Sequence, residues 1–535
     1  MLEPGIQKNE STPLDEIPSP VDFSLPSSGA LPLTLQQRFL RAASCLTLAY
    51  LCGMFLLHPL VFSSFYFNIT ETKQAFFLIT SGLYLLLVLF ARIALPPDYG
   101  VKRQRVTLSP AVIALFALFT VSLVGALIGD YPGESFFGEN NRYQGLLTLF
   151  CYTCLALALS RLEIALKWPE RAFLLGACLV SLFGLLHHFG VDPIGFTRDL
   201  RESDRGRFLS TIGNADFYAS YIAMAFAVSL GYFLHARGKE RFFAAPALAL
   251  VSFGVLVAGS DSAALGLIAL FALAPLFLFR DCAAFRRLAL GWGIFFLCAF
   301  FFGLLSGWLD GVTYLSSLFL RLSRPVFSLP LSAVSFALWL LLNKTKQETL
   351  SRAKRPYVAL LIGAALFGAV ALVLLNTALR SLPLGGLSRY LHFSESWGTD
   401  RGKIWAFAVQ FYARLPLSQQ LFGASSGALF HADAVKPLFS DAGLDTAHNE
   451  YLQYLVTNGA LGLLSYLAAL TFALRAGIQR SRVEPVFRGP TLAVIVYAVQ
   501  AAVNIAQPMT TPILFVLIGI LISRKDPFPE AMPRE

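Results

Sequence analysis

Long apolar segments recur along the whole chain, and each is near the ~20 residues that a helix needs to cross a bilayer. Runs such as "AVIALFALFTVSLVGALIG" (111–129) carry no charge and do not alternate apolar with polar residues, as barrel strands would. Only 14% of the residues are charged, against roughly 25% in soluble globular proteins. These features predict a polytopic α-helical membrane protein.

We count fourteen candidate spans, within a range of twelve to fourteen. With soft boundaries, they fall at 42–62, 74–95, 108–128, 145–160, 171–189, 216–235, 242–259, 262–279, 288–307, 325–342, 356–377, 449–473, 490–506 and 510–523. The chain then divides into a disordered cytoplasmic tail (1–37), spans 1–11 (38–377), a large outer loop (378–448), spans 12–14 (449–523) and a second tail (524–535). The first tail is polar and rich in Pro and Ser, and it lacks the features of a signal peptide. We therefore expect an all-α fold with both termini in the cytoplasm.

The distribution of cationic residues agrees with this orientation. With the N-terminus inside, the inner segments contain 28 of the 42 Lys and Arg residues, and the outer segments contain 14. Short inner segments such as "HARGKERFF" (235–243) are dense in cations, as the positive-inside rule predicts. Much of the net charge of +10 therefore reports orientation, and no single basic face indicates nucleic-acid binding.

Arginines on the outer side are an exception to this bias. Four of them occur in "TRDLRESDRGRF" (197–208), and the loop 378–448 adds more. Arginine binds phosphate oxygens bidentately and keeps its charge, so such a cluster suits a lipid-linked phosphate or diphosphate. A solvated loop with local Asp and Glu pairs is the alternative. Within the large loop, "RGKIWAFAVQFYAR" (401–414) is apolar with cationic ends and predicts a short interfacial helix.

The stretch "DTAHNEYLQYLVTNGALGLLSYL" (445–467) opens a long apolar segment with His448, Asn449 and Glu450. Histidine is the side chain best suited to accept a proton near neutral pH. Asp445 or Thr446 could cap the helix, and the positive end of the helix dipole disfavours imidazolium. A neutral imidazole could act as a general base; a structural histidine beside a capping signal is the alternative.

Metal, cofactor and transport signals are weak. The "CYTC" motif (151–154) lies inside a predicted span, where small residues that pack helices are the better interpretation. The seven cysteines imply no disulfide framework. The spans contain almost no ionisable residues, and we find no internal repeat of the kind that transporters show. We therefore predict no metal site and no cofactor.

Four stretches, in order, carry a family resemblance. "TAHNEYLQYLVTNGALGLLSYL" resembles the signature of the O-antigen ligase and polymerase superfamily, in which a His-Asn pair opens the span after the large outer loop and a Gly-rich stretch follows. The other three, similar to further segments of the family, are "GENNRYQGLLTLFCY" (138–152), "GRFLSTIGNADFYASYIA" (206–223) and "TDRGKIWAFAV" (399–409). The resemblance extends over roughly residues 110–520.

The resemblance implies a glycosyltransferase in the bacterial cytoplasmic membrane, with its active site on the outer face. The donor is a glycan on undecaprenyl diphosphate, and the acceptor is a glycan, a glycolipid or a protein. The implied reaction is inverting and independent of metal, and the chain has no Asp-x-Asp pair for holding a divalent ion under a sugar diphosphate. Arginines would then neutralise the leaving diphosphate, where negative charge develops in the transition state.

The resemblance also implies roles for particular residues of this chain. His448 matches an essential histidine and would activate the acceptor hydroxyl, and Arg401 matches an essential loop arginine that would hold the diphosphate. Weaker matches for substrate binding, or neighbours that would orient other groups, are Arg142, Arg207, Asn214, Asn449 and Asp445.

The chain departs from the family pattern in two places. Many members have a Ser-Arg pair where this chain has "GSDSAAL" (259–265), so Asp261 puts a diphosphate contact there in doubt. The chain also has two spans more than the usual twelve, with the surplus expected in 280–345.

Three other activities remain open. A repeat-unit polymerase or a protein O-oligosaccharyltransferase would share the donor site and differ at the acceptor. A transporter or flippase for lipid-linked glycans is a different class of protein, in which His448 would be dispensable.

Overall fold

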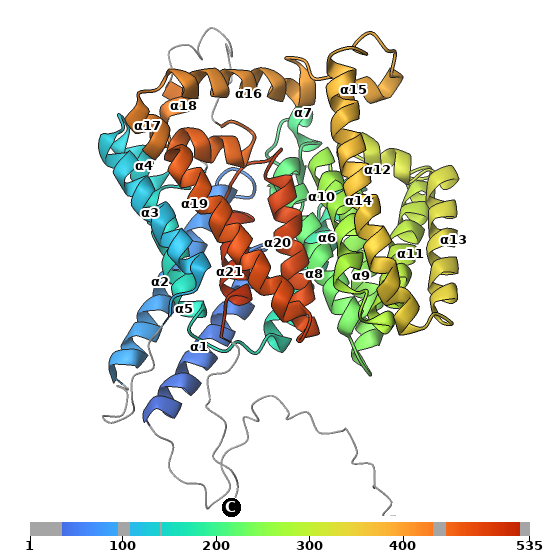
Figure 1. The fold of residues 1–535 in the computed structure, drawn as a ribbon, viewed down its shortest axis with the longest axis horizontal. Coiled ribbons are helices and arrows are strands. Elements are labelled where there is room, and N and C mark those ends of the chain that lie inside the picture. Colours follow the sequence, from blue (N-terminus) through green and yellow to red (C-terminus); the bar gives the residue numbers. More distant parts are fainter. Residues whose placement is uncertain (1–34, 95–106, 140–141, 432–445, 525–535) are drawn as a thin grey trace, which may run out of the picture.

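A computed structural model describes residues 35–94, 107–139, 142–431 and 446–524 (Figure 1). In these ranges the chain is mainly helical, and the one sheet is a short antiparallel pair, β1 (Phe208–Leu209) and β2 (Gly213–Asn214). Most of the two predicted tails, residues 1–34 and 525–535, lies outside the described residues.

Each of the fourteen predicted segments contains a helix. These helices are α1 (Leu35–Leu56), α2 (Ile69–Ala94), α3 (Pro110–Ile128), α5 (Leu146–Leu159), α6 (Lys167–His188), α8 (Ala215–His235), α9 (Glu240–Leu256), α10 (Asp261–Leu273), α11 (Cys282–Leu305), α13 (Pro325–Leu342), α14 (Gln347–Asn376), α19 (Glu450–Ser481), α20 (Arg488–Gln500) and α21 (Thr511–Leu521). Within the described ranges, nine of them are long and apolar enough to cross a membrane: α1, α2, α3, α6, α8, α11, α13, α14 and α19. The other five have 11 to 17 residues. The protein therefore has the character of an α-helical membrane protein.

Helix α8 lies at the centre of the bundle. Its residues from Phe217 to Leu234 are all buried, between α6, α9, α10 and α20. Small side chains allow this close packing: a methyl group on Gly231 would lie 2.3 Å from the Cα of Gly489, at the start of α20. Because α8 is enclosed on all sides, the residues at its N-terminus are held in fixed positions relative to the rest of the bundle.

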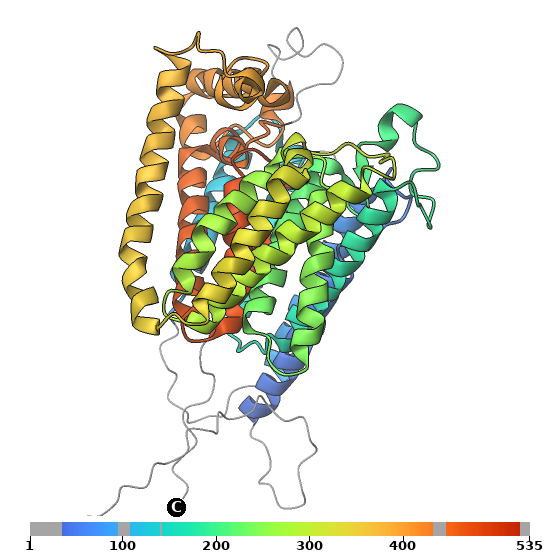
Figure 2. The ribbon, with the colours of Figure 1, turned by 90° about the vertical axis from the view of Figure 1, so that its right-hand side faces the viewer.

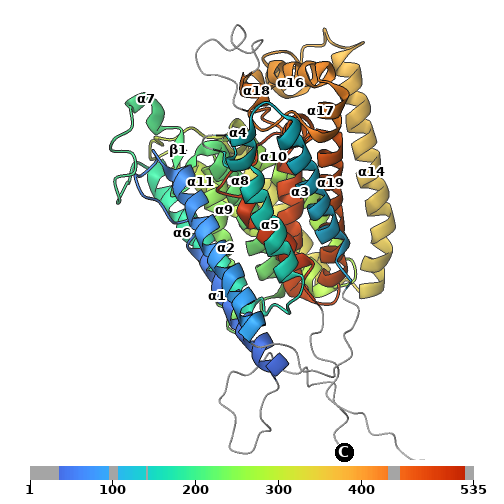
Figure 3. The same ribbon diagram turned by 90° about the vertical axis from the view of Figure 1, so that its left-hand side faces the viewer.

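Several short helices gather at one end of the bundle. They are α15 (Ser388–Leu391), α16 (Trp397–Arg414), α17 (Leu417–Phe422) and α18 (Ala428–His431), and all come from the predicted outer loop. Helix α16 lies crosswise over this end (Figure 1), where the sequence predicts a short helix at 401–414. Helix α14 leads up to it along the edge of the bundle (Figures 2 and 3), and its most apolar part has no buried residues.

Short elements complete the described chain. They are α4 (Pro132–Phe137), α7 (Glu202–Arg205), α12 (Ser317–Leu322), η1 (Ala274–Phe277), η2 (Gly385–Leu387) and η3 (Pro485–Phe487). Helices α11 and α13, from the region where the sequence predicts surplus spans, pack against each other.

Candidate functional site

The start of α19 has an unusual backbone. His448 has a positive φ of 46°, a left-handed conformation that few residues other than glycine adopt. Asn449 is the N-cap, and its side-chain oxygen accepts a hydrogen bond from the backbone N–H of Leu452 at 3.1 Å. The cap is therefore Asn449 and not Thr446, whose hydroxyl instead accepts from the backbone N–H of His448 at 3.4 Å. Asp445 lies outside the described residues.

Glu450, which the sequence left without a role, points into the core. Its carboxylate is fully buried and accepts hydrogen bonds from the hydroxyls of Tyr466, at 2.5 Å, and Tyr497, at 2.8 Å. Its backbone N–H donates to the carbonyl of Ala501 at 2.8 Å. These bonds fix the helix start that follows His448.

The contact between Glu450 and Tyr466 requires a sharp bend in α19. Sixteen residues of straight helix would separate their Cα atoms by about 24 Å, which is too far for the two side chains to meet. The bend occurs at Gly459, where φ is 71° and ψ is 179°. The predicted span 449–473 is therefore not one straight helix, because residues 450–458 form a separate short helix that folds back toward the part that follows.

Residues 378–431, from the predicted outer loop, are called the outer segment after that prediction, and their end packs into this bend. A methyl group on Gly459 would lie 2.3 Å from the carbonyl oxygen of Leu421, and one on Gly423 would lie 2.1 Å from that of Thr457. The backbone N–H of Ala424 donates to the carbonyl of Val456 at 3.0 Å. Only glycine allows the two backbones to approach so closely, which explains the Gly-rich stretch after the His-Asn pair.

Arg401 begins the continuous part of α16. The three residues before it, Gly398 to Asp400, all have positive φ values near 60°, so the chain turns sharply and a new helix begins. The guanidinium group lies 3.8 Å from the carboxylate of Asp216, in the first turn of α8, and the Arg401 side chain is only 18% exposed. Arg401 is therefore held between the outer segment and the central helix.

A small apolar cluster joins α16 to the segment that carries His448. Its buried members are Ile404, Phe407, Ala408, Leu429, Ala447 and Val456. Ala447 is the neighbour of His448, and Ile404 lies one turn after Arg401. The structure thus brings together two predicted site segments that are more than forty residues apart in the sequence.

Two further predicted residues lie at the N-terminus of α8. Asn214 caps the helix, with its side chain accepting from the backbone N–H of Asp216 at 2.8 Å. The guanidinium carbon of Arg142 lies 5.6 Å from the centre of the Phe217 ring, within the range of a cation–π contact. Arg142 and Arg401 therefore contact adjacent residues of the same helix turn.

The backbone of Arg207 adjoins this group, because its carbonyl accepts a hydrogen bond from the N–H of Ala215, one residue before Asp216, at 3.0 Å. The Arg207 side chain, however, is 68% exposed, and it lies 4.0 Å from the carboxylate of Asp204. Arg198, in the same segment, is similarly exposed and lies 3.6 Å from Asp199. For these two arginines the arrangement matches the alternative of a solvated loop with local acidic partners.

A narrow cavity of about 60 Å³ lies beside the grouped residues, and Arg142, Gln144, Thr446, Glu450 and Tyr454 are among those that line it. Pockets for organic ligands usually have roughly 300–1,000 Å³. This space therefore admits a few small groups, and the main part of a large substrate would lie outside it.

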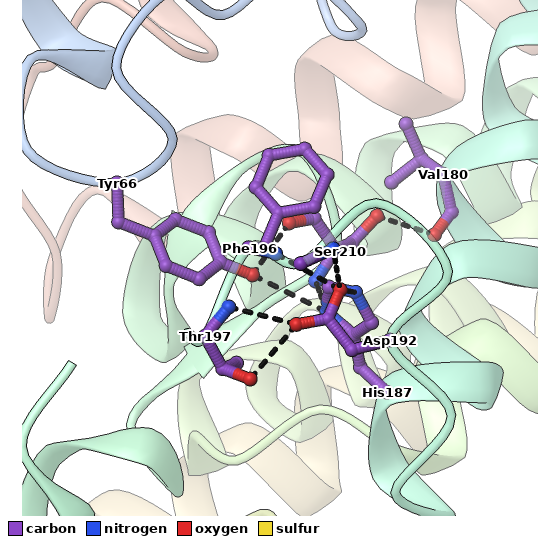
Figure 4. Close-up of polar contacts among 8 residues, drawn as sticks. Tyr66, Val180, His187, Asp192, Phe196, Thr197 and Ser210 are labelled. Carbon is purple, nitrogen blue, oxygen red and sulfur yellow. Dashed lines mark hydrogen bonds and ion pairs between the residues drawn. The ribbon is translucent and has the colours of Figure 1, made fainter. Parts of the chain in front are cut away.

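A polar network holds the segment that leads to Asn214 (Figure 4). Both carboxylate oxygens of Asp192 accept hydrogen bonds from residues 195–197, at 2.7 to 2.9 Å. The backbone N–H of Ser210 donates to Nδ1 of His187 at 3.2 Å, and Nε2 of the same ring lies 3.2 Å from Asp192. Because Nδ1 accepts, Nε2 carries the ring proton and faces the carboxylate.

The charge of Asp192 is favoured by this network. Partial burial opposes ionisation, but the N–H and hydroxyl of Thr197, the N–H of Phe196 and the ring of His187 outweigh it and lower the pKa of the carboxyl group. Burial, with the Asp192 charge adding to it, raises the pKa of the neighbouring Tyr66, whose hydroxyl donates to the Ser210 carbonyl at 2.8 Å. Sequence reasoning missed this network: His187, Asp192 and Thr197 are close in the sequence but match no motif, and Tyr66 lies 121 residues before His187.

Asp261, the departure from the family pattern, fastens the outer segment to the bundle. Its carboxylate accepts hydrogen bonds from the hydroxyls of Ser316 and Tyr390, the latter at 2.9 Å, and lies 3.9 Å from Arg389. The acid at this position is thus matched by an arginine from the outer segment. Its contacts are those of a structural residue, and the cation beside it, Arg389, is paired with the acid.

Across the ranges that the structure describes, no three His, Cys, Asp or Glu side chains gather closely enough to hold a metal ion.

No family model and no curated protein matches the chain. A functional proposal for this chain must therefore rest on Arg142, Arg401 and the segment that contains His448, near the N-terminus of α8.

Proposed function

We propose that this chain is a ligase-like membrane glycosyltransferase of the O-antigen ligase and polymerase superfamily. It transfers a glycan from an undecaprenyl diphosphate carrier to an acceptor hydroxyl at the outer face of the bacterial cytoplasmic membrane. One arrangement carries the proposal: Arg142 and Arg401 contact adjacent residues in the first turn of α8, and α16 packs against the residue before His448. Cations and a histidine are the groups that metal-free transfer from a diphosphate needs.

The proposed topology has fourteen spans, with both termini in the cytoplasm and α15 to α18 outside. Cations support this orientation, because segments such as 235–243 and 343–355 lie at the end of the bundle away from α16 and are rich in Lys and Arg. The candidate site then faces the side where lipid-linked glycans are presented to a ligase.

In the proposed reaction, Arg401 and Arg142 hold the diphosphate. The bond between the anomeric carbon and the diphosphate oxygen breaks, and its electron pair stays on the leaving undecaprenyl diphosphate. The acceptor oxygen bonds to the anomeric carbon from the opposite face, which inverts its configuration, and the hydroxyl proton passes to His448. The arginines favour the transition state because negative charge grows on the leaving group.

The position of His448 suits a base. It directly precedes the N-cap of α19, where the helix dipole disfavours a positive charge. Glu450, in the first turn, would have the opposite effect, but its carboxylate points into the core toward Tyr466 and Tyr497. Asp216 holds Arg401 at 3.8 Å until a diphosphate takes its place.

The test is release of undecaprenyl diphosphate by purified protein in detergent, with a lipid-linked glycan, candidate acceptors and EDTA. His448→Ala should lower release by about 10²–10⁴-fold, the usual contribution of a general base. Arg401→Ala should lower it by about 10²–10³-fold, as loss of one transition-state donor does. Arg198→Ala, an exposed arginine with an acidic neighbour, is the matched control and should release normally.

The acceptor that supports release separates ligase, polymerase and protein O-oligosaccharyltransferase. Normal release by both site variants would contradict the proposed site. Movement of lipid-linked glycan across a vesicle membrane without cleavage of the diphosphate would instead establish a transporter.

A further inference from the structure

A second cavity lies at the opposite end of the bundle from α16. Its volume is about 580 Å³, and it is formed where η1, α11, α14 and the segment between α19 and α20 meet. That segment joins the end of α19, at Ser481, to the start of α20, at Arg488. Glu450, at the other end of α19, contacts Ala501, just after α20, so the cavity is one helix length away from the candidate site.

Four cations line this cavity, and one acid is among them. The cations are Arg280, Lys354, Arg482 and Arg488, and the acid is Asp281. Asp281 pairs with Arg488 at 2.8 Å and also caps α11. Four cations less one acid leave a net charge of +3 on the lining.

The other three cations have no acidic partner among the described residues. No carboxylate in those ranges lies within 4.0 Å of Arg280, Lys354 or Arg482. The positive-inside rule explains cations in exposed loops at this end. Arg280 and Arg482 are exposed turn residues of this kind, and Lys354 is half-buried. The rule does not explain why these cations, from three separate elements, line one cavity, since mutual repulsion disfavours that arrangement and a bound anion would relieve it.

One wall of the cavity is apolar. Leu276, Phe277 and Phe279 line it, at the end of the apolar helix α10 and its continuation η1. A wall of this kind would contribute little to binding a free phosphate ion, which presents only polar oxygens. An amphipathic ligand would use both the cations and the apolar wall.

We propose that this cavity binds the phosphate-bearing headgroup of an anionic phospholipid. Arg280 and Arg482 bind the phosphate oxygens bidentately, Lys354 adds a third charge, and the apolar wall receives the first carbons of the lipid chains. The volume is within the roughly 300–1,000 Å³ of ligand pockets. The site is independent of the transferase proposal, and it lies at the face where anionic lipids attract basic groups.

The test measures lipid binding to the full-length protein in a zwitterionic detergent without phosphate. Short-chain phosphatidylglycerol is titrated, and bound lipid is counted by native mass spectrometry. The pocket variant carries Arg280→Gln, Lys354→Gln and Arg482→Gln. The matched variant carries Lys344→Gln, Arg352→Gln and Arg355→Gln, which remove the same charge at the same end outside the cavity lining.

Each cation near a membrane surface contributes about a fivefold gain in affinity for anionic lipid, so the pocket variant should bind phosphatidylglycerol roughly a hundredfold more weakly. The matched variant should bind it as the unmodified protein does, and phosphatidylcholine should bind weakly to all three proteins.

Two results would overturn the proposal. Equal affinity of the pocket and matched variants would show that the cavity is not the binding site. Displacement of phosphatidylglycerol by equimolar inorganic phosphate would show that the site takes a free anion and that the apolar wall contributes nothing. Each single substitution should weaken binding about fivefold, which guards against a folding defect in the triple variant.

Discussion

Replacing Gly459 by alanine should detach the end of the outer segment from α19. The backbone at Gly459, with φ 71° and ψ 179°, lies in a region that is essentially restricted to glycine, so alanine there costs about 1–3 kcal/mol. The added methyl group would also lie 2.3 Å from the carbonyl oxygen of Leu421 and 2.6 Å from the backbone nitrogen of Gly423. Overpacking of this kind costs a further ~1–3 kcal/mol.

Part of this cost can be avoided if residues 421–424 move away from the bend. The hydrogen bond from Ala424 to Val456 would then break. A local loss of about 3 kcal/mol corresponds to roughly a hundredfold change in the opening equilibrium. Peptides covering 416–431 should therefore exchange amide hydrogens about a hundred times faster, as measured by mass spectrometry of the purified protein.

Gly363→Ala is the matched control. Gly363 also lies in a long apolar helix, α14, but a methyl group there would meet no atom within 4 Å. Alanine should be neutral there or should stabilise the helix slightly. If the Gly459 and Gly363 variants exchange alike in 416–431, the outer segment does not depend on the bend, and our account of the glycine is wrong.

Three further predictions concern side chains. The pKa of Asp192 is lowered in the folded protein, so the stabilisation that its charge provides should be complete above the unfolded pKa of about 3.9 and be lost as the pH falls through the folded pKa. The hydrogen-exchange protection of residues 195–214 should fall over the same pH range. In the Asp192→Asn variant, that protection should not depend on pH in this way. Glu450→Gln leaves one oxygen to accept from two tyrosines and should lower the free energy of unfolding by about 1.5–3 kcal/mol, with a clearly lower thermal midpoint than the exposed control Glu348→Gln. Tyr390→Phe removes hydrogen bonds to Asp261 and Ser317 and should cost about 1–3 kcal/mol, seen as faster exchange in 388–391, whereas Tyr314→Phe, on an exposed side chain, should leave that exchange unchanged.

The sequence predicted where the helices lie. All fourteen predicted segments contain one, because a backbone in lipid must satisfy its own hydrogen bonds and a long apolar segment does so as a helix. It did not predict their lengths equally well: the helices at 490–506 and 510–523 have only 13 and 11 residues, whereas those at 356–377 and 449–473 have 30 and 32. Hydropathy reports composition and does not show where packing against neighbours ends a helix.

The sequence located the candidate site segments without showing how they meet. The positions of Arg142, Arg401 and His448 came from short stretches that resemble segments of a known family. That Arg142 and Arg401 contact adjacent residues of α8, while Arg207 stays exposed, follows from the packing of segments far apart in the chain. No local pattern contains that information.

The amino-acid sequence by itself determined the class of the fold, because apolar length and the need to satisfy the backbone are properties of each segment alone. Only the tertiary structure decided the direction of Glu450, the partner of Asp261 and the contact between the outer segment and α19. These depend on one backbone bend at Gly459 and on close approach between distant segments. Such features arise when the whole chain packs, and no single stretch of sequence determines them.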